Sequence, residues 1–295
     1  LVASYQEMTF NKSTFDLRDK TLLAVDRAKV DGLEMRLAGK TILQVAREGT
    51  NWNMTRPLEV RADYASVEGL IGRLQMTAMK SSVTENASAA DLKKYGLDKP
   101  TAELNVVLGS AKATLVLGAK TENAYYARDA SRPAVMTVDA AFFDEFKKTA
   151  NDYRRKDIFE FRAFNAERLE ITRDGQTVVF ERVKAQTKDA QDTWRRASPN
   201  AGTVDTMKME TFFAKIENTR ASSFVDSTAK TGLDKPFVTV VAKFESAPSV
   251  MKDERITFGR VGADTFALRP GEPGAAKIGS SEFDDALKAL DDVSK

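Results

Sequence analysis

Cysteine and histidine are both absent from the 295-residue sequence. Without them the chain cannot form a disulfide bond, a zinc site of the usual Cys/His type, a thiol nucleophile or a Ser-His-Asp triad. Hydrolytic chemistry would then need carboxylates, a lysine or a carboxylate-bound metal. A chain without thiols also suits an oxidising space outside the cytoplasm, where a stray thiol is a liability.

A surplus of charge of either sign is missing as well, because 45 basic residues stand against 43 acidic ones. Such a chain has no gross electrostatic footprint for nucleic acid or an anionic membrane, so we expect no nucleic-acid partner. No run of the sequence approaches the ~20 apolar residues that span a bilayer. The sequence begins Leu1-Val2-Ala3 rather than with Met. We therefore expect that an N-terminal membrane anchor was removed, that residues 1–14 are the linker after it, and that this anchor is the chain's contact with the membrane.

What the sequence does contain is an internal repeat. Gly96-Leu97-Asp98-Lys99-Pro100 recurs as Gly232-Leu233-Asp234-Lys235-Pro236, a shift of 136 residues. Further pairs recur at shifts of 136 to 142 residues: Lys20 with Lys156, Leu33-Glu34 with Leu169-Glu170, Trp52 with Trp194, Pro57 with Pro199, Asp63 with Asp205, Gly118 with Gly259, and Phe143-Asp144 with Phe283-Asp284. The shift changes only between periodic segments, as loop insertions cause. We therefore predict two tandem modules, residues 15–152 and residues 153–295.

The strand pattern of each module indicates an antiparallel sheet. Apolar residues alternate along residues 33–37, 104–108 and 238–244, as in half-buried strands. Asp174-Gly175 is a strong hairpin-turn signal. Hairpins and short connections favour an α+β fold, in which each repeat is an antiparallel sheet packed with helices.

The helices are predicted from caps and apolar spacing. Asp63 and Asp205 are favourable N-caps. Each is followed by one apolar helix face, made of Val67, Leu70, Ile71 and Leu74 or of Met209, Phe212, Phe213 and Ile216. A short helix over residues 89–95 precedes the repeated motif. A last helix carries Phe142, Phe143 and Phe146, matched by Phe283 and Leu287.

The repeated motif offers the first candidate binding residues. Asp98 with Lys99, and Asp234 with Lys235, are candidate ligand contacts because they recur together in a loop. The alternative is a helix stop, in which Gly96 takes the left-handed position, the next leucine folds back on the last turn and the proline prevents continuation. We favour the helix stop, because it explains the motif without a ligand.

Aromatic residues are the second set of candidates. Trp52 and Trp194 are candidate platforms for a sugar or a peptide, although tryptophan is more often packed in the core or at its edge. Tyr125 and Tyr126 stand beside a basic residue on one expected strand. The second module has Phe266 in place of Tyr126, which favours packing over catalysis.

No motif indicates catalysis. The sequence has no calcium-binding loop, Gly-rich phosphate loop or nucleophile elbow. Acidic pairs such as Asp144-Glu145 and Asp284-Asp285 fall in the first turns of expected helices, where free amides favour negative charge. We therefore expect no enzymatic activity, no metal site and no cofactor.

Several of these motifs follow one another in a fixed order: Leu17-Arg18-Asp19-Lys20, Trp52 with Pro57, Ala62-Asp63, Tyr95-Gly96-Leu97-Asp98-Lys99-Pro100, Leu117-Gly118 and Tyr126-Ala127-Arg128. This order resembles the bacterial domain-of-unknown-function family numbered 4340. The first module matches closely. The second matches more loosely, because Thr231 replaces Tyr95 and Phe266-Ala267-Leu268 replaces Tyr126-Ala127-Arg128. The resemblance implies two tandem copies.

The resemblance implies a setting rather than a mechanism. Proteins of that family commonly look like an N-terminal membrane anchor followed by a part outside the cytoplasm. They are often encoded beside ABC-transporter components similar to those of gliding motility. No catalytic residues are established for the family, so the resemblance implies none.

These observations lead to one hypothesis and two alternatives. The hypothesis is a non-catalytic binding or scaffold component, tethered outside the cytoplasm and associated with a membrane ABC-transport or surface-motility system. The first alternative is a protein that binds glycan or cell-wall polymer through Trp52, Trp194 or Tyr125. The second is a glycoside hydrolase that uses two carboxylates.

Overall fold

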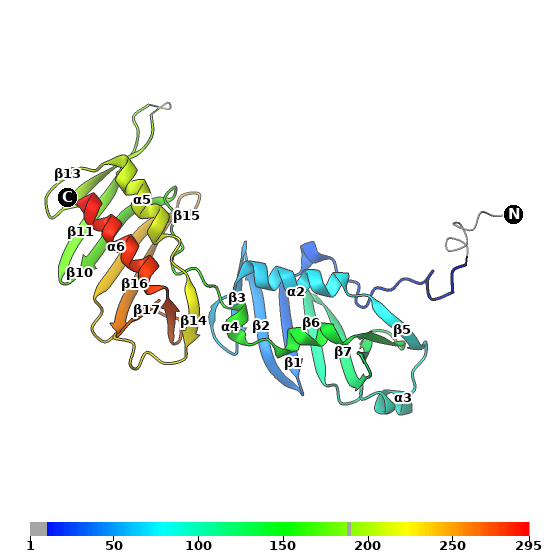
Figure 1. Cartoon of the computed structure of the whole chain (residues 1–295). Coiled ribbons are helices and arrows are strands. Elements are labelled where there is room, and N and C mark those ends of the chain that lie inside the picture. The colour runs from blue at the N-terminus through cyan, green and yellow to red at the C-terminus, as the bar shows by residue number, and fades with distance from the viewer. Residues whose placement is uncertain (1–10, 188–189, 295) are drawn as a thin grey trace. The chain divides into compact units, whose positions relative to one another are not determined.

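The computed structural model describes residues 11–187 and 190–294, so the first ten residues of the expected linker lie outside the described part of the chain. The chain divides into two compact units, one ending at Arg155 and the other beginning at Lys156. We call them unit 1 and unit 2 (Figure 1). The sequence repeat predicts a junction between residues 152 and 153, three residues earlier. No helix within the described ranges is long and apolar enough to cross a membrane.

Unit 1 contains a nine-stranded antiparallel sheet in the order β4-β3-β2-β1-β6-β7-β8-β9-β5. Its strands are β1 (Gly32–Leu37), β2 (Lys40–Glu48), β3 (Asn51–Arg56), β4 (Val60–Arg61), β5 (Met79–Thr84), β6 (Ala102–Leu108), β7 (Ala111–Thr121), β8 (Ala124–Asp129) and β9 (Val135–Asp139). Its helices are η2 (Arg27–Lys29), α2 (Tyr64–Met76), α3 (Ala89–Lys94), η3 (Ala140–Lys147) and α4 (Ala150–Tyr153).

Unit 2 contains a second nine-stranded antiparallel sheet in the order β13-β12-β11-β10-β15-β16-β17-β18-β14. Its strands are β10 (Ala166–Arg173), β11 (Gln176–Val183), β12 (Thr193–Ser198), β13 (Gly202–Thr203), β14 (Ala221–Val225), β15 (Val238–Ala247), β16 (Val250–Val261), β17 (Asp264–Leu268) and β18 (Ala275–Ile278). Its helices are α5 (Thr206–Ile216) and α6 (Ser280–Ser294).

The strand order is the same in both units, which confirms the prediction of repeated sheet modules. Strands dominate each unit, so the fold is mostly antiparallel sheet with a few helices, rather than a balanced α+β fold. The first hairpin is built alike in both. Ala38 and Gly39 have φ of 47° and 77°, and Asp174 and Gly175 have φ of 50° and 80°. Two successive positive φ values are typical of the tight turn that matches strand twist.

The predicted helix caps and apolar faces are confirmed. The Asp63 side chain accepts a hydrogen bond from the Ser66 amide, and the Asp205 side chain accepts one from the Lys208 amide. The apolar face that follows each cap is buried: Val67, Leu70, Ile71 and Leu74 in α2, and Met209, Phe212, Phe213 and Ile216 in α5. These faces pack with the apolar side of the sheet into the main core of each unit, and unit 1 has a smaller cluster of Leu97, Val116 and Val135 as well.

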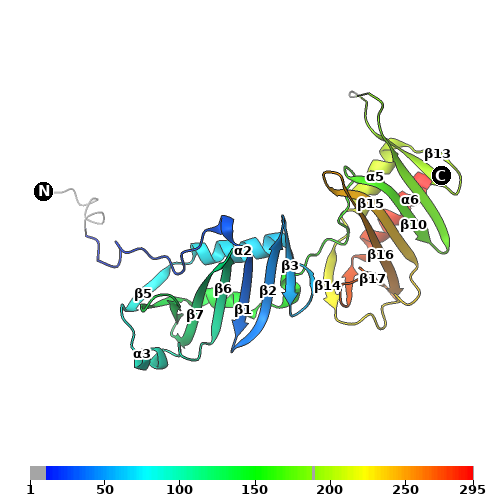
Figure 2. The same ribbon diagram turned by 180° about the vertical axis from the view of Figure 1, so that it is seen from behind.

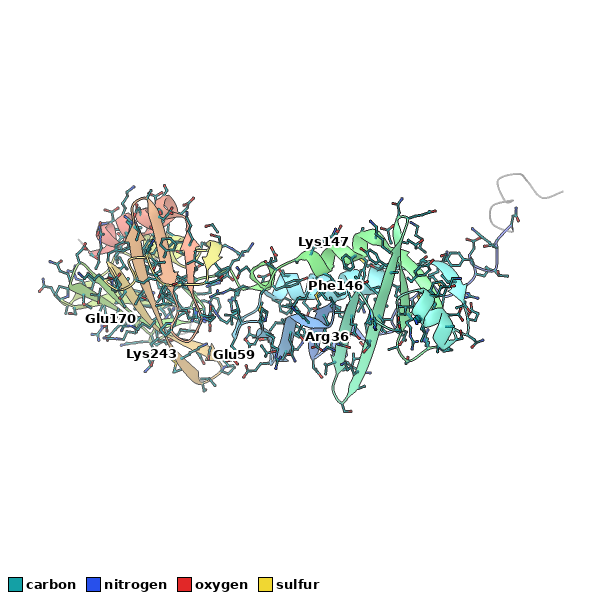
Figure 3. All side chains as sticks on the ribbon, turned by 90° about the horizontal axis from the view of Figure 1, so that it is seen from below. Arg36, Glu59, Phe146, Lys147, Glu170 and Lys243 are labelled. Atoms are coloured by element: carbon teal, nitrogen blue, oxygen red, sulfur yellow. The ribbon has the colours of Figure 1, made fainter. Side chains whose placement is uncertain are left out.

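The two faces of each sheet differ in chemistry. In unit 1, Phe146 and Lys147 belong to η3 on the covered face, whereas Arg36 of β1 lies on the other face (Figure 3). In unit 2, Glu170 and Lys243 lie on the face away from α6 (Figure 3). The strands therefore alternate between core side chains and a charged outer face, as in a sheet that is half solvated.

Two sequence expectations need correction. The helix that carries Phe142, Phe143 and Phe146 is the 3₁₀ helix η3, and it is not the last helix of unit 1, because α4 follows it. Residues three apart eclipse in a 3₁₀ helix, which brings Phe143 and Phe146 together with ring centroids 5.7 Å apart. The sequence pattern also does not predict β5 and β14, because exposed serines interrupt their apolar alternation.

The outer strands of both sheets are short or irregular. β4 and β13 contain two residues each, and β5 and β14 pair with their neighbours through shifted registers, which mark bulges. The first residues of each module close the start of the edge strand. The Met79 amide donates to the Lys20 carbonyl at 2.8 Å, and the Ala221 amide donates to the Lys156 carbonyl at 2.8 Å. Short and bulged edges resist uncontrolled pairing with another chain.

Candidate binding site

Trp52 lies inside unit 1 and cannot offer a ring face to a ligand. Its side chain is 1% exposed. Its indole Nε1 donates to Glu68 Oε1 at 3.1 Å, and the guanidinium of Arg47 lies over its ring, 4.5 Å from the centroid. Packing satisfies both the apolar and the polar parts of Trp52, which favours the packing interpretation over a binding platform.

Glu68 is a buried carboxylate that holds this cluster together. Arg47 Nη2 donates to Glu68 Oε1 at 2.6 Å, and Arg27 Nε donates to Glu68 Oε2 at 2.9 Å. Burial by itself raises the pKa of Glu68, but the hydrogen bonds from Trp52 and Arg27 and the charge of Arg47 outweigh it and lower the pKa. A carboxylate held ionised is unsuited to be the general acid of a glycosidase, which needs a raised pKa.

Trp194, the repeat partner of Trp52, is partly buried in unit 2. Its ring packs against Phe213, with centroids 5.1 Å apart, and Arg182 lies over it at 5.2 Å. An arginine from the preceding strand thus covers the tryptophan in both units. The repeat partner of Glu68 is Glu210, which is exposed. Packing is the main role that the structure gives to Trp194.

Tyr125 and Tyr126 are both partly buried by ring contacts. Tyr125 stacks on Phe143 with ring centroids 4.4 Å apart and planes inclined by 13°. Tyr126 lies against Tyr95, with centroids 4.5 Å apart. Because Tyr95 directly precedes Gly96, this contact places Tyr126 beside the repeated motif. The contacts favour the packing interpretation of both tyrosines.

The repeated motif ends α3 as the helix-stop interpretation predicts. Gly96 has a φ of 68° and its counterpart Gly232 a φ of 72°, and the Leu97 amide donates to the Leu92 carbonyl at 2.8 Å. In unit 1 these are the marks of a left-handed helix end. Gly232 follows a turn instead, because no helix lies between β14 and β15 in the described part of unit 2. The polar candidates Asp98, Lys99, Asp234 and Lys235 are exposed at the surface.

A second glycine explains why the motif loop is so compact. A Cβ atom added at Gly118 of β7 would collide with the carbonyl oxygen of Tyr95, and one added at Gly259 of β16 would collide with that of Thr231. The loop before each motif therefore lies directly on a strand glycine. The sequence repeat contains both pairs of glycines but does not reveal that they meet.

The other buried glutamates are also neutralised by cations. Glu145 binds Arg73 at 2.7 Å and Lys148 at 2.8 Å, and Glu254 binds Arg269. Among the described residues, no group of three or more carboxylates is placed to hold a metal ion.

Unit 2 has a groove between its two helices. α5 and α6 lie side by side on one face of the sheet (Figure 1), and the view from behind shows the strands in front of them (Figure 2). Two adjoining cavities of about 250 and 540 Å³ follow these helices, and Lys215 and Asp285 line both. We call this feature the α5–α6 groove. Met207 and Ala289 give it apolar surface, and the Met207 side chain is 77% exposed.

Asp285 is the acceptor at the centre of the α5–α6 groove. Lys288 Nζ donates to Asp285 Oδ1 at 2.9 Å. This bond, the charge of Lys288 and that of Lys215 lower the pKa of Asp285. The Asp285 side chain is 49% exposed. The groove therefore offers a charged acceptor that a bound molecule can reach.

Sequence reasoning does not find this groove. It expects Asp284-Asp285 in the first turn of a helix, but α6 begins at Ser280 and the acidic residue of its first turn is Glu282. It cannot show that one of the two aspartates faces α5, because that depends on how two helices separated by more than sixty residues pack. The available signal is the repeat itself, which aligns Lys215 with Arg73 and Asp285 with Glu145.

Comparison with known proteins gives one result. A family model described as Domain of unknown function (DUF4340) matches residues 52–236. The match begins in β3 and ends just before β15, so it crosses the junction of the units and includes α5 but not α6. One family copy in each unit therefore stays a prediction. No curated protein and no solved structure matches the chain.

Proposed function

The chain belongs to the DUF4340 family, whose model spans more than half of it, and we propose that it is a non-catalytic binding or scaffold component that acts through protein contacts. In this proposal it is tethered to a membrane and lies outside the cytoplasm. Its partners are subunits of an ABC-transport or surface-motility system, the setting that the family resemblance implies. The two units descend from one duplicated α+β module. The chain needs no cofactor and binds no nucleic acid.

The α5–α6 groove is the observation that supports a binding role. It combines a reachable carboxylate, lysine ammonium groups and exposed apolar surface in one concave feature. Concave sites with a few placed polar groups on a mainly apolar wall are typical of specific binding. A tether raises the local concentration of such a site at its membrane partner, so even a weak contact is effective.

The sheet edges are less suited to this role than the groove. An extended partner segment needs a regular, unpaired strand to add to. β4 and β13 are too short for this, and β5 carries bulges and Lys80. Charged and bulged edges are devices that prevent strand addition. We therefore place the partner contact on a helical face.

The two alternative functions have less support. A glycan site needs an exposed aromatic face, and Trp52 is enclosed while Trp194 and Tyr125 pack against phenylalanine rings. A two-carboxylate hydrolase needs one carboxyl group with a raised pKa. The buried Glu68 instead has a lowered pKa.

The test is recovery of the tethered, full-length protein from its native membrane, with mass spectrometry of the proteins that accompany it. We expect ATP-binding-cassette subunits to be enriched over a control bait that carries the same tether and an unrelated domain. Recovery without any partner protein, together with retention on isolated cell-wall polymer, overturns the proposal in favour of glycan binding.

A further inference from the structure

Unit 1 has a buried tyrosine among the residues that correspond, by the shifts of the repeat, to the charged residues of the α5–α6 groove. Tyr153, at the end of α4, is 1% exposed and its hydroxyl donates to Glu145 Oε2 at 3.2 Å. The Lys148 ammonium lies over the Tyr153 ring, 5.7 Å from its centroid. The Tyr153 carbonyl accepts from the amide of Asp63, the cap of α2, at 2.8 Å. Burial and the charge of Glu145 raise the pKa of Tyr153, so its hydroxyl stays a donor.

The groups around Tyr153 recur in unit 2. At the shift of 142 residues that aligns α2 with α5, Arg73 corresponds to Lys215. At the shift of 140 that aligns η3 with α6, Glu145 corresponds to Asp285 and Lys148 to Lys288. The lysine–carboxylate contact is kept, at 2.8 Å in unit 1 and 2.9 Å in unit 2.

The tyrosine itself does not recur. Its counterpart at the same shift is Val293, which is 7% exposed and belongs to the core of unit 2. Unit 2 therefore keeps the charged side chains that surround a tyrosine in unit 1 and lacks the tyrosine. Lys215 and Asp285 line both cavities of the groove, and Lys288 lines the smaller one.

We propose that the α5–α6 groove binds a tyrosine side chain from a partner protein, with the phenol hydroxyl donating to Asp285 and the ring against Lys288. This inference rests on the proposed protein-binding function and names one surface and the chemistry of its partner. Asp285 favours a ligand with a hydroxyl donor and repels a carboxylate or phosphate, and Lys288 favours a ligand with an aromatic ring face. A phenol has both a hydroxyl donor and a ring face, whereas a phenyl ring has only the ring face.

The chain supplies its own probe for this site. A synthetic peptide with the sequence of residues 148–155 contains Tyr153 and the short helix α4. The peptide is titrated into the ¹⁵N-labelled 295-residue chain to about 1 mM. Weak binding is still measurable by NMR at this concentration. We expect chemical-shift changes at α5 and α6. The same peptide with phenylalanine in place of tyrosine should bind about tenfold more weakly, because it lacks a hydrogen bond to a charged acceptor.

Two matched variants locate the contact. Asp285→Asn should weaken the tyrosine peptide about tenfold and leave the phenylalanine peptide nearly unchanged. Asp264→Asn is the control, since Asp264 is also an aspartate of unit 2, is equally exposed at 49% and also pairs with a lysine, Lys277. It should change neither affinity. Absence of binding, shifts away from α5 and α6, or equal effects of the two variants overturn the inference.

The failure of this inference is distinguishable from failure of the proposed function. Asp285→Asn is introduced into the tethered bait as well. If that bait still recovers the same membrane partners and the peptide does not bind, the protein-binding function stands and the tyrosine site is wrong. If the unaltered bait recovers no protein, the proposed function is wrong whatever the peptide does.

Discussion

Unit 1 and unit 2 each have a glutamate at the same position of corresponding helices, and the surroundings of the two glutamates differ. Glu68 of α2 is buried among Arg27, Arg47 and Trp52, whereas Glu210 of α5 is exposed. The difference comes from what lies beside the helix. Arg27 of η2 reaches Glu68, and the residue at the repeat position of Arg27 is Ala163. One scaffold thus supports an internal ion cluster in one unit and a solvated carboxylate in the other.

The helix pairs show the same contrast on the opposite side of the helix. In unit 1 the Arg73–Glu145–Lys148 cluster closes around Tyr153, and Glu145 is 2% exposed. In unit 2 the corresponding groups line open cavities. A repeated fold can keep its strand order while one unit buries polar side chains and the other leaves the corresponding side chains exposed at the surface.

The largest expected effect sharpens the contrast between the two glutamates. Glu68→Ala leaves Arg47 and the Trp52 indole nitrogen without their buried acceptor, and we expect it to lower the free energy of unfolding by about 3 kcal/mol. Glu210→Ala is the matched control, and we expect a change within about 0.5 kcal/mol. Urea unfolding followed by far-ultraviolet circular dichroism measures both. Equal losses would contradict the assignment of Glu68 as an internal ion cluster.

The second prediction tests a feature that the units share. Gly118→Ala and Gly259→Ala each force a methyl group into the loop before the repeated motif, and we expect each to cost about 2 kcal/mol of stability. Gly69→Ala is the control: it lies on the exposed side of α2 with no atom within 4 Å. It should stabilise the chain by about 0.5–1 kcal/mol. A loss at one strand glycine and not at the other would show that the two motifs are built differently.

The third prediction concerns the buried tyrosine of unit 1 and the open groove of unit 2. Tyr153→Phe removes a buried hydrogen bond to Glu145 and should lower stability by about 1 kcal/mol. Asp285→Asn, at the corresponding acceptor of unit 2, should change stability by less than about 0.5 kcal/mol because Asp285 is half exposed. Tyr64→Phe, at a tyrosine that is 54% exposed, is the control for loss of a hydroxyl. A larger loss at Asp285 than at Tyr153 would mean that the open groove is itself a structural element.

Much of the fold could be predicted because its signals are local. Asp63 and Asp205 cap their helices through bonds to residues three positions ahead, and the hairpin at Asp174-Gly175 is set by its own backbone angles. The apolar faces behind the caps are periodic within one helix. The repeat supports these predictions further, because the same caps and apolar spacing occur in both modules.

The site could not be predicted in the same way, because it depends on long-range packing. Trp52 and Trp194 have similar surroundings in the sequence, but only the fold shows that Glu68 and Arg47 enclose Trp52. η3 is a 3₁₀ helix and α6 a long α-helix, although both have the same Phe-Asp pair at their fourth and fifth positions. The groove lies along α5 and this long helix, and the packing of one helix on the other is not encoded by the spacing within either.

The smallest expected effects are at the repeated motif, and they decide whether its charged residues have a role beyond the helix stop. Asp98, Lys99, Asp234 and Lys235 are exposed, so we expect alanine at each position to change the free energy of unfolding by less than about 0.5 kcal/mol. The same variants, placed in the tethered bait, should recover partners as the unaltered chain does. If Asp98→Ala and Asp234→Ala keep full stability and lose the partners, the loops are contact sites after all.

Because the motif recurs in both units, a variant with both substitutions then shows whether one loop or either loop makes the contact. A loss only in the double variant means that either loop suffices, whereas a loss in one single variant assigns the contact to one unit.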